Sequence, residues 1–166
     1  MPLDVDSALR HLDRMVAAAR ALAGNQADAD DLVQEVYLSL LQRPRKLKRG
    51  SEVAYLMTML RNAQVDRYRA AARRQTSSLD EAEEPEDPRS GLRPDRAAEG
   101  REVLDAVHAI ESPFRETVVA VDVLGLSYKE AARALDTPVG TVMSRLARGR
   151  ERVISLLEPL PEGARG

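Results

Sequence analysis

Residues 127–145 of this 166-residue chain read SYKEAARALDTPVGTVMSR. The stretch predicts two short helices joined by a tight turn. Ser127 and Glu130 have the spacing of a capping box, in which each side chain accepts a hydrogen bond from the other residue's backbone N–H. Thr137 suits the N-cap of the second helix, and Pro138 suits its first position, where a missing N–H costs nothing. Two helices in this order are typical of a helix-turn-helix, which places its second helix in the DNA major groove.

The second helix, predicted over 138–157, has two unlike faces. Val139, Val142 and Leu146 are spaced by three and four residues, so we expect them to pack against the first helix. The opposite face carries hydroxyl and guanidinium groups, on Thr141, Ser144, Arg145, Arg148 and Arg152. Guanidinium groups can bind guanine O6 and N7 or phosphates, and short hydroxyl side chains allow a close approach. A solvated charged face is the alternative, but the caps, the turn and the one-sided arginines favour a DNA-reading helix.

The composition restricts the class of protein. The chain has 43% hydrophobic residues, no tryptophan and no cysteine, so disulfides and thiolate metal sites are excluded. We find no apolar run near the length of a membrane span and no signal-peptide pattern. We therefore expect a soluble, cytoplasmic protein.

The formal net charge of −2 hides local patches of both signs. Residues 43–74 contain ten basic side chains and only two acidic ones, whereas residues 75–102 contain four basic and nine acidic ones. Affinity for nucleic acid depends on such local clustering rather than on the total charge.

The periodic stretches predict an all-α fold of two small helical domains joined by a flexible acidic linker. The N-terminal domain is expected over 1–74, the linker over 75–96, and the helix-turn-helix domain over 97–166. The linker is rich in Asp, Glu, Ser and Pro and cannot bury enough apolar surface to become ordered. Helices are predicted over 4–23, 28–42, 52–74, 97–111, 114–124, 128–135 and 138–157.

The helix predicted over 28–42 has one apolar face, made by Leu32, Val33, Val36, Tyr37, Leu40 and Leu41. The other face is acidic and amide-rich and includes Asp31, Gln34 and Glu35. Leu38 also points outward among these groups. A single exposed leucine is common, but one ringed by carboxylates and amides is typical of a surface that docks a basic, partly apolar partner.

The next helix and the loop before it favour contact with unpaired DNA. We expect Val53, Leu56, Met57, Leu60 and Ala63 to form the buried stripe of this helix. The far side carries an aromatic ring, polar groups and arginines, including Tyr55, Thr58, Asn62 and Arg69, which suit base stacking, base edges and phosphates. The basic side chains of the loop, suited to backbone phosphates, are Arg45, Lys46, Lys48 and Arg49. Asp66 shares this side of the helix but is better explained as an ion-pair partner of Arg69 or Arg73 than as a DNA contact.

These three surfaces, in this order, resemble the bacterial RNA polymerase sigma factors of the small extracytoplasmic-function (ECF) type. Residues 30–37 resemble the family's helix that binds core polymerase, residues 55–69 resemble the segment that recognises and melts the minus-ten element, and residues 138–148 resemble the helix that reads the minus-thirty-five element. Tyr55 stands where the family often has tryptophan. Met143 and Ala147 stand where it often has basic or aromatic residues.

The resemblance implies function and partners. The chain would direct promoter-specific transcription initiation, with its acidic helix on the clamp helices of the β′ subunit and a further contact to the β flap. The linker would thread toward the RNA path. Promoter DNA is the second implied partner and an anti-sigma factor a third, although nothing in the residues identifies one. Neither membrane insertion, nor a cofactor, nor a metal is expected.

Three other classes remain as alternatives. A polymerase-independent helix-turn-helix regulator would use the C-terminal helices but leave the acidic face and the Tyr55 side without a role. An enzyme is disfavoured because the only histidines, His11 and His108, fall in different predicted domains without a ligand-spaced partner. A purely structural helical protein would not need arginines on one side of a helix.

Overall fold

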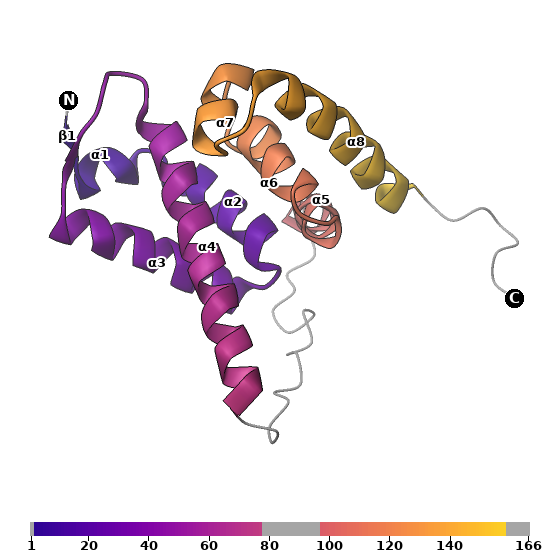
Figure 1. The fold of residues 1–166 in the computed structure, drawn as a ribbon, viewed down its shortest axis with the longest axis horizontal. Helices are drawn as coiled ribbons and strands as arrows, with labels where there is room; N and C mark the ends of the chain where they lie inside the picture. Colours follow the sequence, from indigo (N-terminus) through magenta and orange to yellow (C-terminus); the bar gives the residue numbers. More distant parts are fainter. Residues whose placement is uncertain (1, 78–96, 159–166) are drawn as a thin grey trace, which may run out of the picture.

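The computed structural model describes residues 2–77 and 97–158 and is almost entirely helical there (Figure 1). Its helices and its two short strands, in chain order, are β1 (Pro2–Leu3), α1 (Val5–Leu9), α2 (Leu12–Ala23), α3 (Gln26–Gln42), β2 (Arg45–Lys46), α4 (Glu52–Ser77), α5 (Ala97–Ala109), α6 (Phe114–Val118), the π-helical turn η1 (Val119–Val123), α7 (Tyr128–Ala134) and α8 (Val139–Leu157). The predicted all-α class is confirmed. Most of the acidic linker lies outside the described residues, although α4 continues into its first three positions.

The single helix predicted over 4–23 is wrong, because two helices occupy it. Asp4 and Ser7 form a capping box that starts α1. This helix ends at Leu9, and His11 becomes the N-cap of α2. The backbone N–H of His11 still donates to Ala8 O at 2.9 Å, so the chain bends without losing this hydrogen bond.

A two-residue antiparallel pairing joins the N-terminus to the basic loop. Pro2 pairs with Lys46, and Leu3 with Arg45. The Leu3 side chain is fully buried, whereas both partners in the loop are exposed. The pairing is too short to show an alternating pattern in the sequence, so periodicity could not predict it.

The helix-turn-helix confirms one predicted cap and corrects the other. Ser127 Oγ accepts from Glu130 N at 3.1 Å, and the Glu130 carboxylate accepts from Ser127 N at 2.7 Å. Thr137 is not the N-cap of α8: its hydroxyl donates to Leu135 O at 3.0 Å, and Pro138 takes the cap position without a side-chain hydrogen bond. The turn passes through Asp136 in the left-handed region, with φ of 49°.

The buried faces mostly follow the predicted stripes, with two exceptions. Val142 and Leu146 are buried on α8, but Val139 is 37% exposed because it lies in the first turn, at the rim of the contact. On α3, Leu41 is 64% exposed and so does not belong to the predicted apolar face. On α4, Leu56, Met57, Leu60 and Ala63 are buried and Val53 is half-buried.

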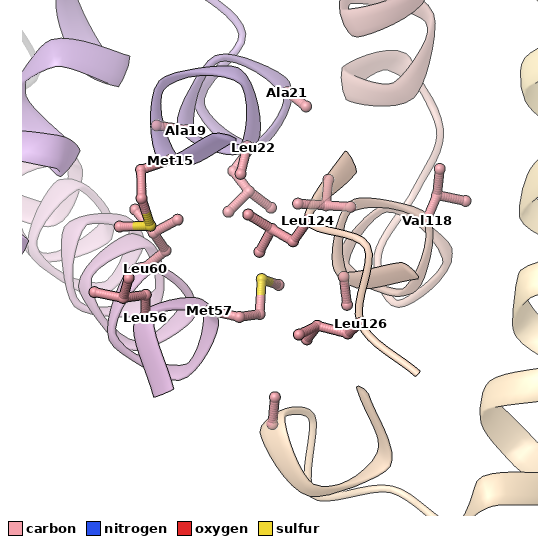
Figure 2. Close-up of a cluster of buried hydrophobic side chains, with 14 of the residues drawn as sticks. Met15, Ala19, Ala21, Leu22, Leu56, Met57, Leu60, Val118, Leu124 and Leu126 are labelled. Carbon is pink, nitrogen blue, oxygen red and sulfur yellow. The ribbon is translucent and has the colours of Figure 1, made fainter. Parts of the chain in front are cut away.

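The two halves of the chain share one hydrophobic core. Helix α2 packs against α5 and η1, and α4 packs against α7. In Figure 2, Leu124 and Leu126, which follow η1, point toward Leu22 of α2 and Met57 of α4. All four side chains are at most 5% exposed. In this conformation the halves therefore form a single packed unit.

Candidate functional site

The acidic face of α3 is exposed as the sequence predicts. Asp31, Gln34 and Glu35 are all accessible, and Leu38 is 56% exposed among them. Together with Ser39, Gln42 and Arg67 they line a shallow, open hollow. An apolar side chain surrounded by carboxylates and amides suits a basic partner with an apolar contact point.

Arg67 is a contributor to this surface that the sequence analysis missed. It projects from α4, and its guanidinium lies 3.3 Å from Asp28 and 3.5 Å from Asp31. It therefore partly neutralises the acidic surface and fixes one of its carboxylates. The sequence around Arg67 does not indicate these ion pairs, because they depend on how α4 crosses α3.

The basic loop presents its cations to solvent on an ordered backbone. Arg45, Lys46, Lys48 and Arg49 are all exposed. The loop is tied by the β1–β2 pairing and by Leu47, which packs on the core. An exposed cluster on a fixed backbone is suited to phosphate binding.

The residues predicted on the far side of α4 face two different helices, α3 and α7. Tyr55, Asn62 and Asp66 line a groove with Glu35 and Ser39 of α3. Tyr55 is half-buried and packs against the core, so one part of its ring remains accessible. Arg69, farther along the helix, is exposed. This groove joins the stripe of α4 to the acidic face of α3.

Thr58 faces the other way. Its hydroxyl donates to Ala54 O at 3.2 Å within α4 and lies 3.5 Å from Ala134 O of α7. The predicted DNA-contacting residue is therefore half-buried against the helix-turn-helix. The structure does not group it with Tyr55 and Asn62.

The side chains of α8 that were predicted to read DNA do not all lie in similar surroundings. Ser144 and Arg148 are exposed, and Thr141 and Arg145 are half-buried. The hydroxyl of Ser144 donates to Thr141 O at 3.1 Å.

Arg152 lies apart from them. Its guanidinium carbon is 4.1 Å from the centre of the Phe114 ring, and it pairs with Glu111. Within the described structure, this arginine ties α8 to the start of α6.

A pocket of about 320 Å³ lies between the two halves. From the first half it is lined by Leu22, Arg61, Gln64, Val65 and Tyr68, and from the second by Ser112, Pro113, Arg115, Glu116, Thr117, Leu135, Thr137 and Arg145. The predicted base-reading Arg145 therefore shares a cavity with side chains of α4. The α4 side chains in this cleft are not among those predicted to contact DNA, so of the predicted DNA contacts Arg145 alone lines it.

Other types of site find no support in the described ranges. Across residues 2–77 and 97–158, no three His, Asp or Glu side chains are grouped so as to hold a metal ion. None of the helices in those ranges has the length and apolarity needed to cross a membrane.

Comparison with known families matches each half separately. Sigma-70 region 2 matches residues 8–74, and Sigma-70, region 4 matches residues 101–153. The first match covers α2, α3 and α4, and the second covers the helix-turn-helix.

Individual relatives align over most of the chain. The ECF RNA polymerase sigma factor EcfG of Rhodopseudomonas palustris is 32% identical over 155 residues, which are 92% of this chain and 83% of that protein. The ECF RNA polymerase sigma factor SigE of Mycolicibacterium smegmatis is also 32% identical, over 87% of this chain and 57% of its own length.

Solved structures share the fold. The sigma factor RpoE of Bartonella quintana, in complex with the anti-sigma factor NepR, superposes with a TM-score of 0.67 at 24% identity and covers 92% of this chain and 96% of that one. CnrH, in complex with the cytosolic domain of CnrY, gives a TM-score of 0.57 at 24% identity over 90% of this chain and 83% of that one.

Proposed function

Because the chain belongs to the ECF RNA polymerase sigma factors, we propose that three of its surfaces divide the work of that family. A sigma factor binds core RNA polymerase and directs transcription initiation at particular promoters, and this is the function of the chain. The polymerase-independent regulator is not favoured, because both sigma-70 regions are present in their order.

The core-binding surface is the acidic face of α3. The observation that carries this assignment is the 56% exposed Leu38, held among Asp31, Gln34 and Glu35. Such a surface fits the basic clamp helices of the β′ subunit, because opposite charges steer the encounter and the leucine supplies an apolar contact. The matching contact of the second half would be to the β flap.

Two further surfaces would bind the promoter. The basic loop and the accessible part of Tyr55, with Asn62 and Arg69, suit the melted minus-ten element, since cations hold phosphates and an aromatic ring can stack on a base. Thr141, Ser144, Arg145 and Arg148 of α8 suit the minus-thirty-five element in the major groove. We leave Thr58 and Arg152 out of these surfaces because both are engaged within the protein.

The remaining partners follow from the same assignment. Since the similar sigma factor RpoE was solved with the anti-sigma factor NepR, we include an anti-sigma factor among the proposed partners. We place the site of action in the cytoplasm, where bacterial RNA polymerase works.

Charge reversal on α3 tests the proposal. We expect Asp31→Arg combined with Glu35→Arg to abolish co-purification with core polymerase, because two carboxylates become like charges facing a basic partner. The matched control reverses two exposed acids outside α3, Asp13 and Glu102, with the same change in net charge. Circular dichroism checks that both variants keep their helices. If the α3 variant binds core polymerase as well as the control does, the α3 assignment is wrong.

A further inference from the structure

Helix α8 turns one face away from the core, and this face carries two unlike rows of side chains. The buried stripe on the opposite side consists of Val142, Leu146, Gly149 and Val153. Residues four apart lie one above the other on a helix. The apolar row of the outward face is Val139, Met143 and Ala147, and the polar row beside it is Gly140, Ser144 and Arg148. All six residues are exposed.

The apolar row was not part of the DNA surface expected from the sequence. Of the three arginines in that surface, Arg148 alone lies in the two outward rows. Arg145 is half-buried and lines the pocket shared with α4, and Arg152 pairs with Glu111. The outward face of α8 is therefore less charged than the sequence spacing indicates, and half of it is apolar.

Met143 is the longest side chain of the apolar row and is 51% exposed. Its neighbours are small: Ala147 follows it in the same row, and Gly140 lies beside it in the polar row. Nothing lies within 4 Å of a Cβ added to Gly140, so the space next to Met143 is open. Small neighbours allow the helix to approach a groove closely, and a flexible thioether can adapt to the surface that it meets.

The major groove of DNA presents one apolar group to such a side chain, the C5 methyl group of thymine. The polar row beside Met143 suits the other base edges and the phosphates, through the guanidinium of Arg148. The hydroxyl of Ser144 donates to Thr141 O at 3.1 Å, so its proton is already engaged within the helix. An apolar row next to a single guanidinium thus complements a thymine that lies beside a base with hydrogen-bond acceptors.

A protein partner is less well supported as the occupant of this row. Exposed apolar side chains are denser at the other end of α8, where Ile154, Leu156 and Leu157 are each at least 40% exposed. That cluster begins about 16 Å farther along the helix, at a rise of about 1.5 Å per residue. Met143 is instead next to Ser144 and in the first half of the helix.

We propose that Met143 selects thymine in the minus-thirty-five element of this chain's promoters, by packing its thioether against the C5 methyl group in the major groove. The proposal deepens the proposed function and rests on it, because that function assigns α8 to this element. Cytosine or uracil at the same position lacks the methyl group and is bound more weakly.

Uracil in place of thymine tests the contact, because the two bases differ only in the C5 methyl group. The probe is a promoter selected from a random library by holoenzyme made with the natural chain. Each thymine of its minus-thirty-five element, on either strand, is replaced singly by uracil. We expect one replacement to weaken holoenzyme binding about three- to fivefold, as for the loss of one apolar methyl contact. Uracil in the spacer between the two elements is the control and should have no effect.

Substitution of Met143 assigns the contact to its side chain. With Met143→Ala, holoenzyme should bind the thymine promoter about three- to fivefold more weakly and should no longer distinguish it from the uracil promoter. Met143→Leu keeps an apolar side chain and should retain most of the discrimination. Ile154→Ala is the matched control, because Ile154 is 55% exposed on the same helix. It should leave the ratio of the two affinities unchanged.

The outcomes separate this proposal from the proposed function. If the holoenzyme selects no promoter at all, the proposed function fails and the proposal fails with it. If it binds a promoter but no uracil in the element weakens binding, or if Met143→Ala keeps the discrimination, only the thymine contact is wrong. Loss of co-purification of Met143→Ala with core polymerase would identify the apolar row as a protein-binding surface and would also overturn the proposal.

Discussion

At the scale of single residues, the surroundings of a side chain decide its role more than its type does. Arg148 and Arg152 lie one helical turn apart on α8, and sequence spacing assigns both to DNA. Both are exposed, but Arg152 also covers the ring of Phe114 and pairs with Glu111. The sequence could place both on one side of a helix, but it could not show that α6 brings an aromatic ring to one of them.

The two arginines should therefore respond differently to substitution. We expect Arg148→Ala to weaken binding of the reconstituted holoenzyme to its promoter by about 1–3 kcal/mol, if the guanidinium reads a base. Arg152→Ala should leave that affinity nearly unchanged and lower the free energy of unfolding by about 0.5–1 kcal/mol, through loss of the cation–π contact. Filter binding to a promoter selected with the natural protein, alongside urea unfolding, measures both. If the two variants weaken promoter binding equally, Arg152 also contacts the DNA and its assignment to a structural role is wrong.

Residue-scale prediction also failed where a side chain had two hydrogen-bonding choices. Ser127 caps α7 as its spacing with Glu130 predicts, because the two partners satisfy each other. Thr137 had no such reciprocal partner, and its hydroxyl turns back to Leu135 O instead. A capping box is therefore more informative in a sequence than a single capping residue.

At the scale of elements, α8 approaches α6 closely at a glycine. An added Cβ at Gly149 would lie 2.7 Å from a methyl carbon of Val118 and 3.4 Å from the backbone oxygen of Phe114. Val118 is buried and β-branched, so its side chain has little freedom to move aside. The glycine thus sets how closely the DNA-reading helix packs on its support.

Gly149→Ala should destabilise the protein even though alanine is the better helix former. The gain in helix propensity is about 1 kcal/mol, whereas overpacking costs about 1–3 kcal/mol, so we expect a net loss. Gly140→Ala is the matched control on the same helix, because nothing lies within 4 Å of its added Cβ, and it should be neutral or slightly stabilising. Thermal unfolding followed by circular dichroism compares the two. A Gly149→Ala variant as stable as Gly140→Ala would show that α6 shifts to accommodate the added methyl group without a cost in stability.

At the scale of the whole molecule, the sequence predicted the helices but not the packing of the two halves into one hydrophobic core. The stripe Leu56, Met57, Leu60 is evident from helical periodicity, which shows that a face is buried but not against what. Met57 points toward Leu126 of the other half (Figure 2). A buried stripe has the same sequence pattern whether it packs within its own domain or against the other half. With a flexible linker expected between the halves, each stripe was therefore assigned to the core of its own domain. The short β1–β2 pairing was missed for the related reason that it is a long-range contact without a periodic signal.

If the halves form one cooperative unit, substitutions across the seam between them should not be additive. We expect the coupling free energy between Met57→Ala and Leu126→Ala to be about 0.5–3 kcal/mol, as for side chains in contact. Leu40→Ala provides the control, because Leu40 is equally buried but lies on α3, away from the seam, and its effect should add to that of Leu126→Ala within about 0.5 kcal/mol. Urea unfolding of the natural chain, the three single variants and the two double variants gives both couplings. Additive behaviour at the Met57–Leu126 pair would mean that the halves unfold independently.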